Sequence, residues 1–239
     1  HDYLQGATLV VFDFETAPLL QYRSDPKASL DPHRACIVGI SLSVKTGSAI
    51  YIPLQHFDGG NADPGTVIPY LRDALWMSPS ITKVAHNLAF EAQFLFALGI
   101  VLQTPCYDTI AAAQLTLKSN FEFRGLSDSG LKTLVPKLLG VELPSFEEVT
   151  GGRFFDELSP DAPETIRYAC ADSDYALQLY HRFNAWFETY IPAHRTLVEQ
   201  VESPTAIFCG LMKYNGLLMD RHRMICKQLE CMDRLVELR

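Results

Sequence analysis

Residues 7–16 read ATLVVFDFET, a short apolar run that ends in two acidic residues. The segment 7–14 is apolar and rich in β-branched residues, which predicts a buried strand. Residues i and i+2 of a strand point to the same face, so Asp13 and Glu15 face the same way at the end of this strand. Two such carboxylates repel each other and are costly to desolvate unless a cation lies between them. The alternative is an ordinary polar strand end that faces water.

The remaining pattern predicts an α/β fold with a mixed five-stranded sheet flanked by helices. A hairpin followed by strand–helix alternation is typical of such a sheet. Further strands are expected at 36–44, 49–53, 81–85 and 105–108, and helices at 64–77, 88–98, 109–117, 125–140 and 161–190. Beyond Pro192 the pattern predicts helices around a turn at 214–216. We therefore expect a first domain at 1–192 and a truncated helical domain at 193–239.

The bulk composition indicates a folded protein. The chain has 239 residues, 48% of them hydrophobic, and no apolar run approaches the roughly 18 residues of a membrane helix. No signal peptide is evident and the chain lacks an initial Met, so we expect a cytoplasmic fragment of a longer protein. Six scattered cysteines are typical of reduced thiols. A zinc site at His33 and Cys36, or at His222, Cys226 and Cys231, is disfavoured because neither group has the paired spacing of such sites.

The charge limits how the chain contacts nucleic acid. The net charge is −8, whereas a protein that grips duplex DNA by itself is usually basic, so we expect only short, local contacts. Bound divalent cations would offset part of the acidic charge. Five basic residues fall in one stretch, which is either a solvated face or a surface for the nucleic-acid backbone: Lys118, Arg124, Lys132, Lys137 and Arg153.

Two further motifs place polar residues on predicted helices. In YACAD, Tyr168 and Asp172 are four residues apart and share a helix face, although Asp172 could simply contact a loop. In HNLAFE, Asn87 is the expected helix N-cap and Glu91 follows one turn later, in a site or as an exposed side chain. Asp108 and Thr109 form another expected N-cap pair.

Together these segments supply four acids from three parts of the chain: Asp13, Glu15, Glu91 and Asp172. Carboxylate oxygens are hard ligands that suit Mg²⁺ or Mn²⁺. Several converging carboxylates without a Lys or Arg in the motifs predict two cations, about 3.5–4 Å apart.

The three motifs resemble a known superfamily. FDFET, HNLAFE and YACAD are similar, in order and spacing, to the exonuclease motifs of the DEDD superfamily in its tyrosine branch. The histidine branch would carry His five residues before the last Asp, and that position is Arg167. Most of the chain resembles the 3′-5′ proofreading domain of family A DNA polymerases, the bacterial DNA polymerase I type. Residues 198–220 resemble the segment that leads into the polymerase thumb.

The resemblance implies a ribonuclease H-like domain that hydrolyses the 3′-terminal phosphodiester of single-stranded or frayed DNA. It implies that Tyr168 orients the attacking water, that Thr16 and Asn87 lie near the terminal nucleotide, and that a polymerase domain belongs to the same parent chain. Two Mg²⁺ or Mn²⁺ ions would be held by Asp13, Glu15, Glu91 and Asp172, with Glu91 standing where the family usually has Asp. Two alternatives stay open: an RNA exonuclease like ribonuclease D, and a catalytically weakened nucleic-acid-binding scaffold.

Overall fold

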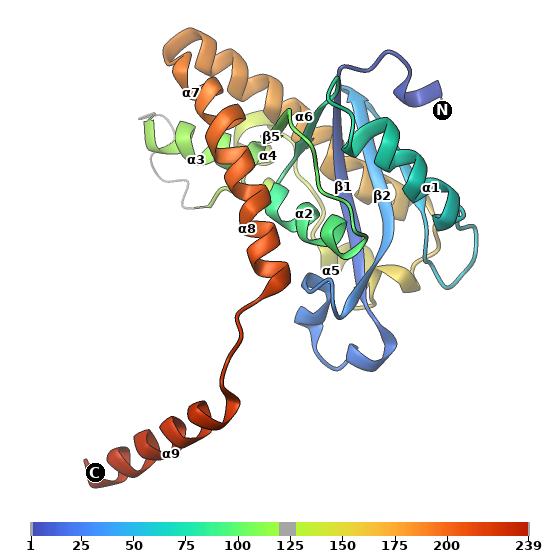
Figure 1. Cartoon of the computed structure of the whole chain (residues 1–239). Coiled ribbons are helices and arrows are strands. Elements are labelled where there is room, and N and C mark those ends of the chain that lie inside the picture. Colours follow the sequence, from blue (N-terminus) through green and yellow to red (C-terminus); the bar gives the residue numbers. More distant parts are fainter. Residues whose placement is uncertain (1, 120–127, 239) are drawn as a thin grey trace.

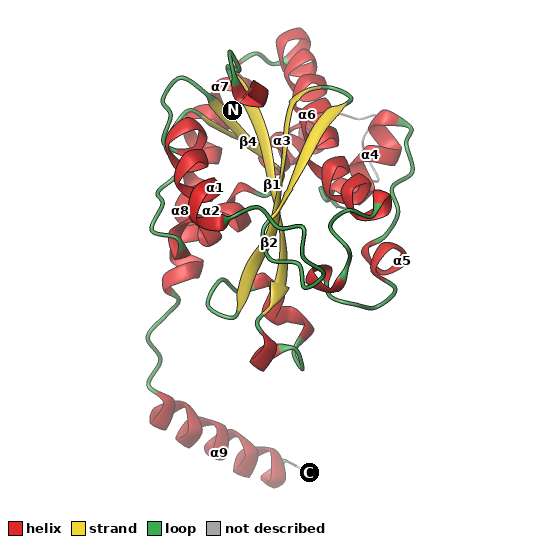
Figure 2. Cartoon of the chain, turned by 90° about the vertical axis from the view of Figure 1, so that its right-hand side faces the viewer, coloured by secondary structure: helices red, strands yellow, loops and turns green. Residues whose placement is uncertain are grey.

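The computed structural model describes residues 2–119 and 128–238 and shows a mixed five-stranded sheet with helices on both faces (Figures 1 and 2). The strands are β1 Leu9–Pro18, β2 Ala35–Lys45, β3 Ser48–Pro53, β4 Thr82–Ala85 and β5 Cys106–Asp108. Their order is β3-β2-β1-β4-β5. The first three strands pair antiparallel, while β4 and β5 run parallel to β1. This arrangement confirms the sheet that the sequence predicts.

The helices follow the predicted order with three differences. The main helices are α1 Pro64–Leu71, α2 Leu88–Ala97, α3 Thr109–Ser119, α4 Leu131–Leu139, α5 Phe146–Thr150, α6 Pro163–Tyr190, α7 Ala193–Leu197, α8 Ser203–Asn215 and α9 Arg221–Glu237. A π-helical turn, η4 (Arg72–Trp76), prolongs α1 and another, η7 (Val198–Glu202), joins α7 to α8.

Two of the predicted helices begin later than expected, and one observed helix was not predicted. The helix expected at 125–140 begins at Leu131: residues 128–130 are loop, and 120–127 lie outside the described residues. The helix expected from 161 begins at Pro163. The short α5 was not predicted, although a capping box between Ser145 and Glu148 stabilises its start.

Alternation along β1 divides its side chains between two apolar layers. Val10, Phe12 and Phe14 pack with Trp76 of η4 on one face. Val11 points to the other face and packs into the layer that includes α4 and α6. Because the period of a strand is two, Asp13 and Glu15 share the face of Val11 and lie under α6.

The position of Asp13 and Glu15 within β1 differs from the expectation. The strand does not end at Glu15 but continues to Pro18, with a bulge between Glu15 and Thr16. The reason is that β2 starts early enough, at Ala35, to supply partners for the last residues of β1. The two acids therefore lie inside the sheet rather than at its edge.

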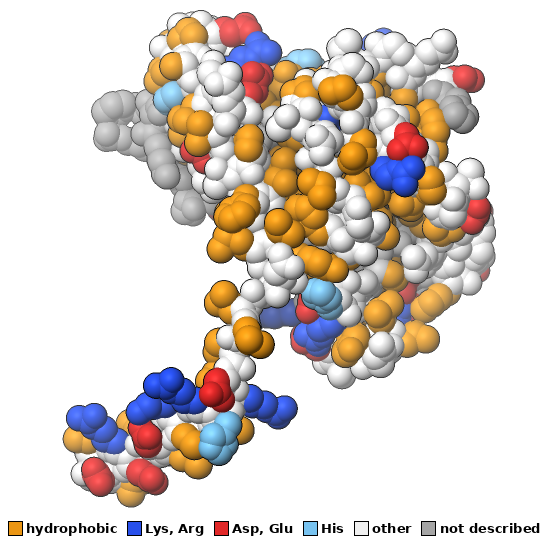
Figure 3. All heavy atoms as spheres, in the orientation of Figure 1, with side chains coloured by type: hydrophobic (Ala, Val, Ile, Leu, Met, Phe, Trp, Pro, Cys, Tyr) orange, Lys and Arg blue, Asp and Glu red, His pale blue; other side chains and the backbone are white. Residues whose placement is uncertain are grey.

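The C-terminal helices fall into two groups. Helix α8 packs against α2 so closely that a Cβ on Gly210 would lie 2.6 Å from the Ala89 carbonyl oxygen. In contrast, α9 stands away from the rest of the chain, and its residues up to Glu237 are exposed (Figures 1 and 3).

The domain boundary at 192/193 stays a prediction. None of the helices in the described ranges is long and apolar enough to cross a membrane.

Candidate active site

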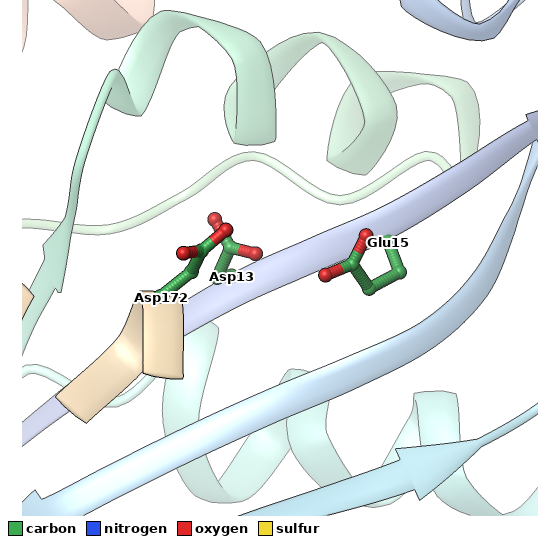
Figure 4. Close-up of side chains that lie close together, drawn as sticks. All are labelled: Asp13, Glu15 and Asp172. Carbon is green, nitrogen blue, oxygen red and sulfur yellow. The ribbon is translucent and has the colours of Figure 1, made fainter. Parts of the chain in front are cut away.

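Three carboxylates meet where α6 crosses β1. Asp13 and Glu15 come from the strand and Asp172 from the helix, and one potential ligand atom of each lies within 4.8 Å of the others. Figure 4 shows the Asp13 and Asp172 carboxylates close together, with Glu15 further along β1. Glu15 is buried, while Asp13 and Asp172 are half-buried. We call these three residues the acid cluster.

The surroundings of the acid cluster do not supply enough positive charge to neutralise its three carboxylates. Burial raises the pKa of Asp13 well above its usual value, and the negative charge of Asp172 raises it further. Burial also raises the pKa of Glu15 well above its usual value, and the charges of Asp13 and Asp172 add to this rise. The pKa of Asp172 is raised by burial and held down by Lys132. Glu15 Oε1 and Asp172 Oδ1 are buried without a hydrogen-bond partner. Buried hard oxygen donors without partners fit a divalent cation such as Mg²⁺ or Mn²⁺.

Tyr168 lies one helical turn before Asp172 on α6, as the YACAD motif predicts. Its side chain is 7% exposed, and its ring packs against Phe155, with 5.9 Å between the ring centroids. Burial raises the pKa of the Tyr168 hydroxyl, and the charges of Asp172, Glu15 and Asp13 raise it further. The hydroxyl therefore stays protonated at neutral pH and can donate a hydrogen bond beside the acid cluster.

Glu91 lies beside the acid cluster but is not a member of it. It is 1% exposed in the first turn of α2, and its Oε2 has no hydrogen-bond partner. Burial raises its pKa well above the usual value, and the charges of Asp13 and Asp108 add to this rise. The structure thus buries a fourth carboxylate close enough to Asp13 to interact electrostatically, and its role as a metal ligand stays a prediction.

The start of α2 is capped differently from the prediction. Asn87 takes the left-handed conformation, φ 83° and ψ 57°, and its side chain does not cap the helix. Instead, the Asp108 carboxylate accepts hydrogen bonds from the backbone N–H groups of Asn87 and Leu88, both at 3.1 Å, and of Ile110 at 2.9 Å. A carboxylate replaces the amide cap because β5 places Asp108 directly below the helix start. The exposed Asn87 side chain is thereby left for other contacts.

Thr16 borders a groove beside the acid cluster. Its hydroxyl donates to the Ser29 carbonyl at 2.8 Å, which fixes the short helix η3 (Pro26–Leu30) against β1. The groove has a volume of about 530 Å³, and its walls include Glu15, Phe146 and Arg153. The Phe146 ring and the Arg153 cation, together with the buried Glu15 carboxylate, suit a nucleotide. The substrate-binding roles of Thr16 and Asn87 stay predictions.

Lys132 is the residue near the site that sequence reasoning missed. It lies on α4, with Nζ 3.7 Å from Asp172 Oδ1 and 4.2 Å from the centroid of the Tyr168 ring. In the sequence, Lys132 is only one member of the basic stretch described above. Another member, Arg124, lies outside the described residues. Nothing local distinguishes Lys132 from Lys137, because the distinction arises from the packing of α4 on α6.

The structure does not support the zinc alternative. Across residues 2–119 and 128–238, the acid cluster is the one group of three or more acidic, His or Cys side chains that meets the geometry of a metal site. Cys226 Sγ and His222 Nε2 are 3.7 Å apart on α9, but Cys231 does not join them. All six cysteines are free thiols.

Comparison with known proteins identifies the family. A family model described as 3′-5′ exonuclease matches residues 3–187, which include β1, α2 and all but the last three residues of α6. The chain belongs to this 3′-5′ exonuclease family. DNA polymerase I of Pseudomonas aeruginosa is 26% identical over 98% of this chain and 24% of its own length. DNA polymerase I of Chloroflexus aurantiacus is 30% identical over 81% of this chain and 20% of its own length. The chain thus spans about a quarter or a fifth of these relatives.

Solved structures share the ribonuclease H-like exonuclease fold. Brucella melitensis NrnC with bound Mg²⁺ has a TM-score of 0.61 at 21% identity, covering 92% of this chain and 93% of its own. Escherichia coli RNase D, an exoribonuclease, has a TM-score of 0.59 at 16% identity, covering 90% and 48%. Pol1 of M. smegmatis has a TM-score of 0.69 at 15% identity, covering 99% and 34%. These similarities confirm the predicted fold class.

Proposed function

We propose that this 3′-5′ exonuclease acts on the 3′ end of single-stranded or frayed DNA, releases nucleoside 5′-monophosphates, and proofreads as part of a DNA polymerase I-like protein. The observation that carries the proposal is the acid cluster, with unpartnered oxygens on Glu15 and Asp172 beside a groove large enough for a nucleotide. The two DNA polymerase I relatives, which align with most of this chain, support the DNA substrate and the polymerase context.

The chemistry is hydrolysis of the last phosphodiester. Water adds to phosphorus, the bond from phosphorus to the 3′ oxygen of the preceding sugar breaks, and that oxygen takes up a proton. Asp13, Glu15 and Asp172 would hold a divalent cation, with Glu91 supporting a second one. Such cations, when bound, acidify water and withdraw charge from the phosphoryl oxygens.

The chain's own side chains supply orientation. The protonated Tyr168 hydroxyl, next to the carboxylates that raise its pKa, donates a hydrogen bond that holds the attacking water in line. Phe146 and Arg153 line the groove next to Glu15, where a base could stack and a phosphate could be neutralised. A frayed end is preferred because an unpaired base enters the groove at lower cost.

The substrate is tested with matched oligonucleotides. The structural neighbours include an exoribonuclease, so an RNA substrate is the second candidate. Equal concentrations of one sequence as single-stranded DNA and as RNA, each with Mg²⁺, should give faster monophosphate release from the DNA. Faster release from the RNA would replace the DNA proposal with the ribonuclease one. Binding of either strand without hydrolysis in Mg²⁺ or Mn²⁺ would favour the scaffold.

A further inference from the structure

Lys132 brings a positive charge to the edge of the acid cluster from an element that none of the three motifs includes. Its Nζ donates to the Pro144 carbonyl oxygen at 3.1 Å, lies over the Tyr168 ring at 4.2 Å and stands 3.7 Å from Asp172 Oδ1. The ammonium group thus links α4, the loop before α5, and the two α6 side chains on which the proposed chemistry depends.

We infer that Lys132 is a counter-cation that the chain itself supplies to the acid cluster. It is a positioning residue that holds Asp172 and Tyr168 in place before a divalent cation binds, and its positive charge opposes the binding of that cation. The inference rests on the proposed function in one respect, namely that the acid cluster binds a divalent cation. It does not require Lys132 to contact the substrate.

The distances distinguish a counter-cation from an ordinary salt-bridge partner. At 3.7 Å the ammonium group is close enough to neutralise Asp172 but too far to form a hydrogen bond with it, and Asp172 Oδ1 has no hydrogen-bond partner. The direct hydrogen bond goes to Pro144 instead. Lys132 therefore reduces the repulsion within the acid cluster while leaving the Asp172 oxygen free for a metal ion.

The contact with the Tyr168 ring adds a positioning role. An ammonium group over an aromatic face is attracted by the ring electrons, and this attraction acts on the ring and not on the hydroxyl. Lys132 therefore restrains the ring from outside while the hydroxyl keeps its hydrogen-bonding capacity. Because Tyr168 and Asp172 are one turn apart on α6, a single cation from α4 restrains both.

Thermodynamic linkage gives the inference its measurable consequences. If Lys132 stabilises the metal-free acid cluster but not the metal-bound one, it weakens the binding of a divalent cation by the same factor. Loss of the charge should then have two coupled effects: tighter metal binding, and a less stable metal-free protein. Saturation with metal should remove most of the stability difference. A lysine that only packs would change stability equally with and without metal.

The experiment uses the whole chain and Mn²⁺ alone, without DNA. Lys132→Met removes the charge, Lys132→Arg keeps it, and Lys137→Met is the matched control because Lys137 is an exposed lysine on the same helix. Calorimetric titration should show that Lys132→Met binds Mn²⁺ about 3- to 10-fold more tightly than wild type, as expected for a partly screened charge pair. The gain should shrink towards 1 M salt, where the screening length is about 3 Å.

Thermal melting of the same proteins supplies the second readout. In EDTA, Lys132→Met should melt about 2–4 °C below wild type, and most of this gap should close in saturating Mn²⁺. Lys132→Arg and Lys137→Met should resemble wild type in both conditions. Lys132→Gln, which removes the charge but keeps a polar end, replaces the methionine variant if the latter does not fold.

Two outcomes would overturn the inference, and they differ from failure of the proposed function. If wild type binds Mn²⁺ and Lys132→Met binds it with the same affinity, Lys132 is not a counter-cation. An equal loss of melting temperature with and without Mn²⁺ would assign it to packing alone. If wild type binds no more Mn²⁺ than Asp13→Asn, the metal site itself is wrong, and the proposed function fails together with the inference.

Discussion

Asp13, Glu15 and Asp172 meet in one cluster because two independent spacings converge there. The i and i+2 spacing puts Asp13 and Glu15 on the α6 face of β1, and α6 places Asp172 above them. Each spacing alone occurs on ordinary protein surfaces. Their convergence leaves like charges with unpartnered oxygens, which is costly in the metal-free protein and favours binding of a cation.

The variant Asp13→Asn should lose hydrolysis and gain stability. The activity should fall by more than about 100-fold, which is the upper range for losing a group that only supports a metal ligand. Without metal, the raised pKa of Asp13 means that its ionisation destabilises the folded state as pH rises above the usual carboxyl pKa of about 4. The variant should therefore melt above wild type in EDTA at pH 7, and this gain should disappear at lower pH.

Melting curves in EDTA across this pH range check the prediction, with Asp58→Asn, a change at an exposed turn, as the control. A variant that keeps wild-type hydrolysis would exclude Asp13 from the site.

At Tyr168 the ring and the hydroxyl can be separated. Tyr168→Phe keeps the ring contacts with Phe155 and Lys132 and removes only the hydroxyl. We expect kcat to fall about 100-fold, as the loss of a positioning contact can cause, with little change in KM or melting temperature. Steady-state kinetics on single-stranded DNA measure this split. An unchanged kcat would mean that the tyrosine serves only in packing.

The role of Glu91 can be tested by comparing activity in Mg²⁺ with activity in Mn²⁺. Its carboxylate is fully buried next to Asp13 but lies outside the acid cluster, so its contribution depends on how well it reaches a second cation. Mg²⁺ demands near-ideal octahedral geometry, whereas Mn²⁺ is expected to be more tolerant. Glu91→Gln should therefore lose more activity in Mg²⁺ than in Mn²⁺, as paired assays would show. Equal losses in both metals would argue against a ligand role, and no loss would remove Glu91 from the site.

At the scale of elements, Asp108 connects the sheet to two helices. It caps the start of α2 and accepts from Ile110 in α3 while 4% exposed. Asp108→Ala leaves these N–H groups without their partner and should destabilise the protein by about 2 kcal/mol or more. Asp108→Asn keeps one acceptor oxygen and should cost less. Chemical denaturation compares the two, and equal stability of Asp108→Ala and wild type would refute the capping role.

The elements also show how far the sequence determines the fold. All five strands and most helices follow from apolar periodicity, because burial dictates that pattern directly. The length of β1 does not, since Thr16 and Ala17 stay in the strand only because β2 pairs with them across a bulge. Asn87 was the expected cap by residue type, yet Asp108, 21 residues later, takes that place. Lys132 was equally hidden, because contacts between distant segments leave no local signal.

At the scale of the whole molecule, the body that carries the site extends from the N-terminal strand to α8. Ser203 at the start of α8 accepts a hydrogen bond from the Asp108 N–H at 2.8 Å, and α8 packs on the helix that carries Glu91. Helix α9 lies apart with its apolar and basic side chains exposed (Figure 3). The family assignment covers residues 3–187, within this body, so we expect catalysis to depend on the body and not on α9.

The most direct test is digestion of a 5′-labelled single-stranded DNA, comparing wild type with Asp172→Asn. With Mg²⁺, wild type should shorten the strand one nucleotide at a time from its 3′ end and release nucleoside 5′-monophosphates. The products should be absent in EDTA and with Asp172→Asn, even though that variant folds. Shortening that persists in EDTA, or that Asp172→Asn performs at the wild-type rate, would contradict a metal-dependent exonuclease built on the acid cluster.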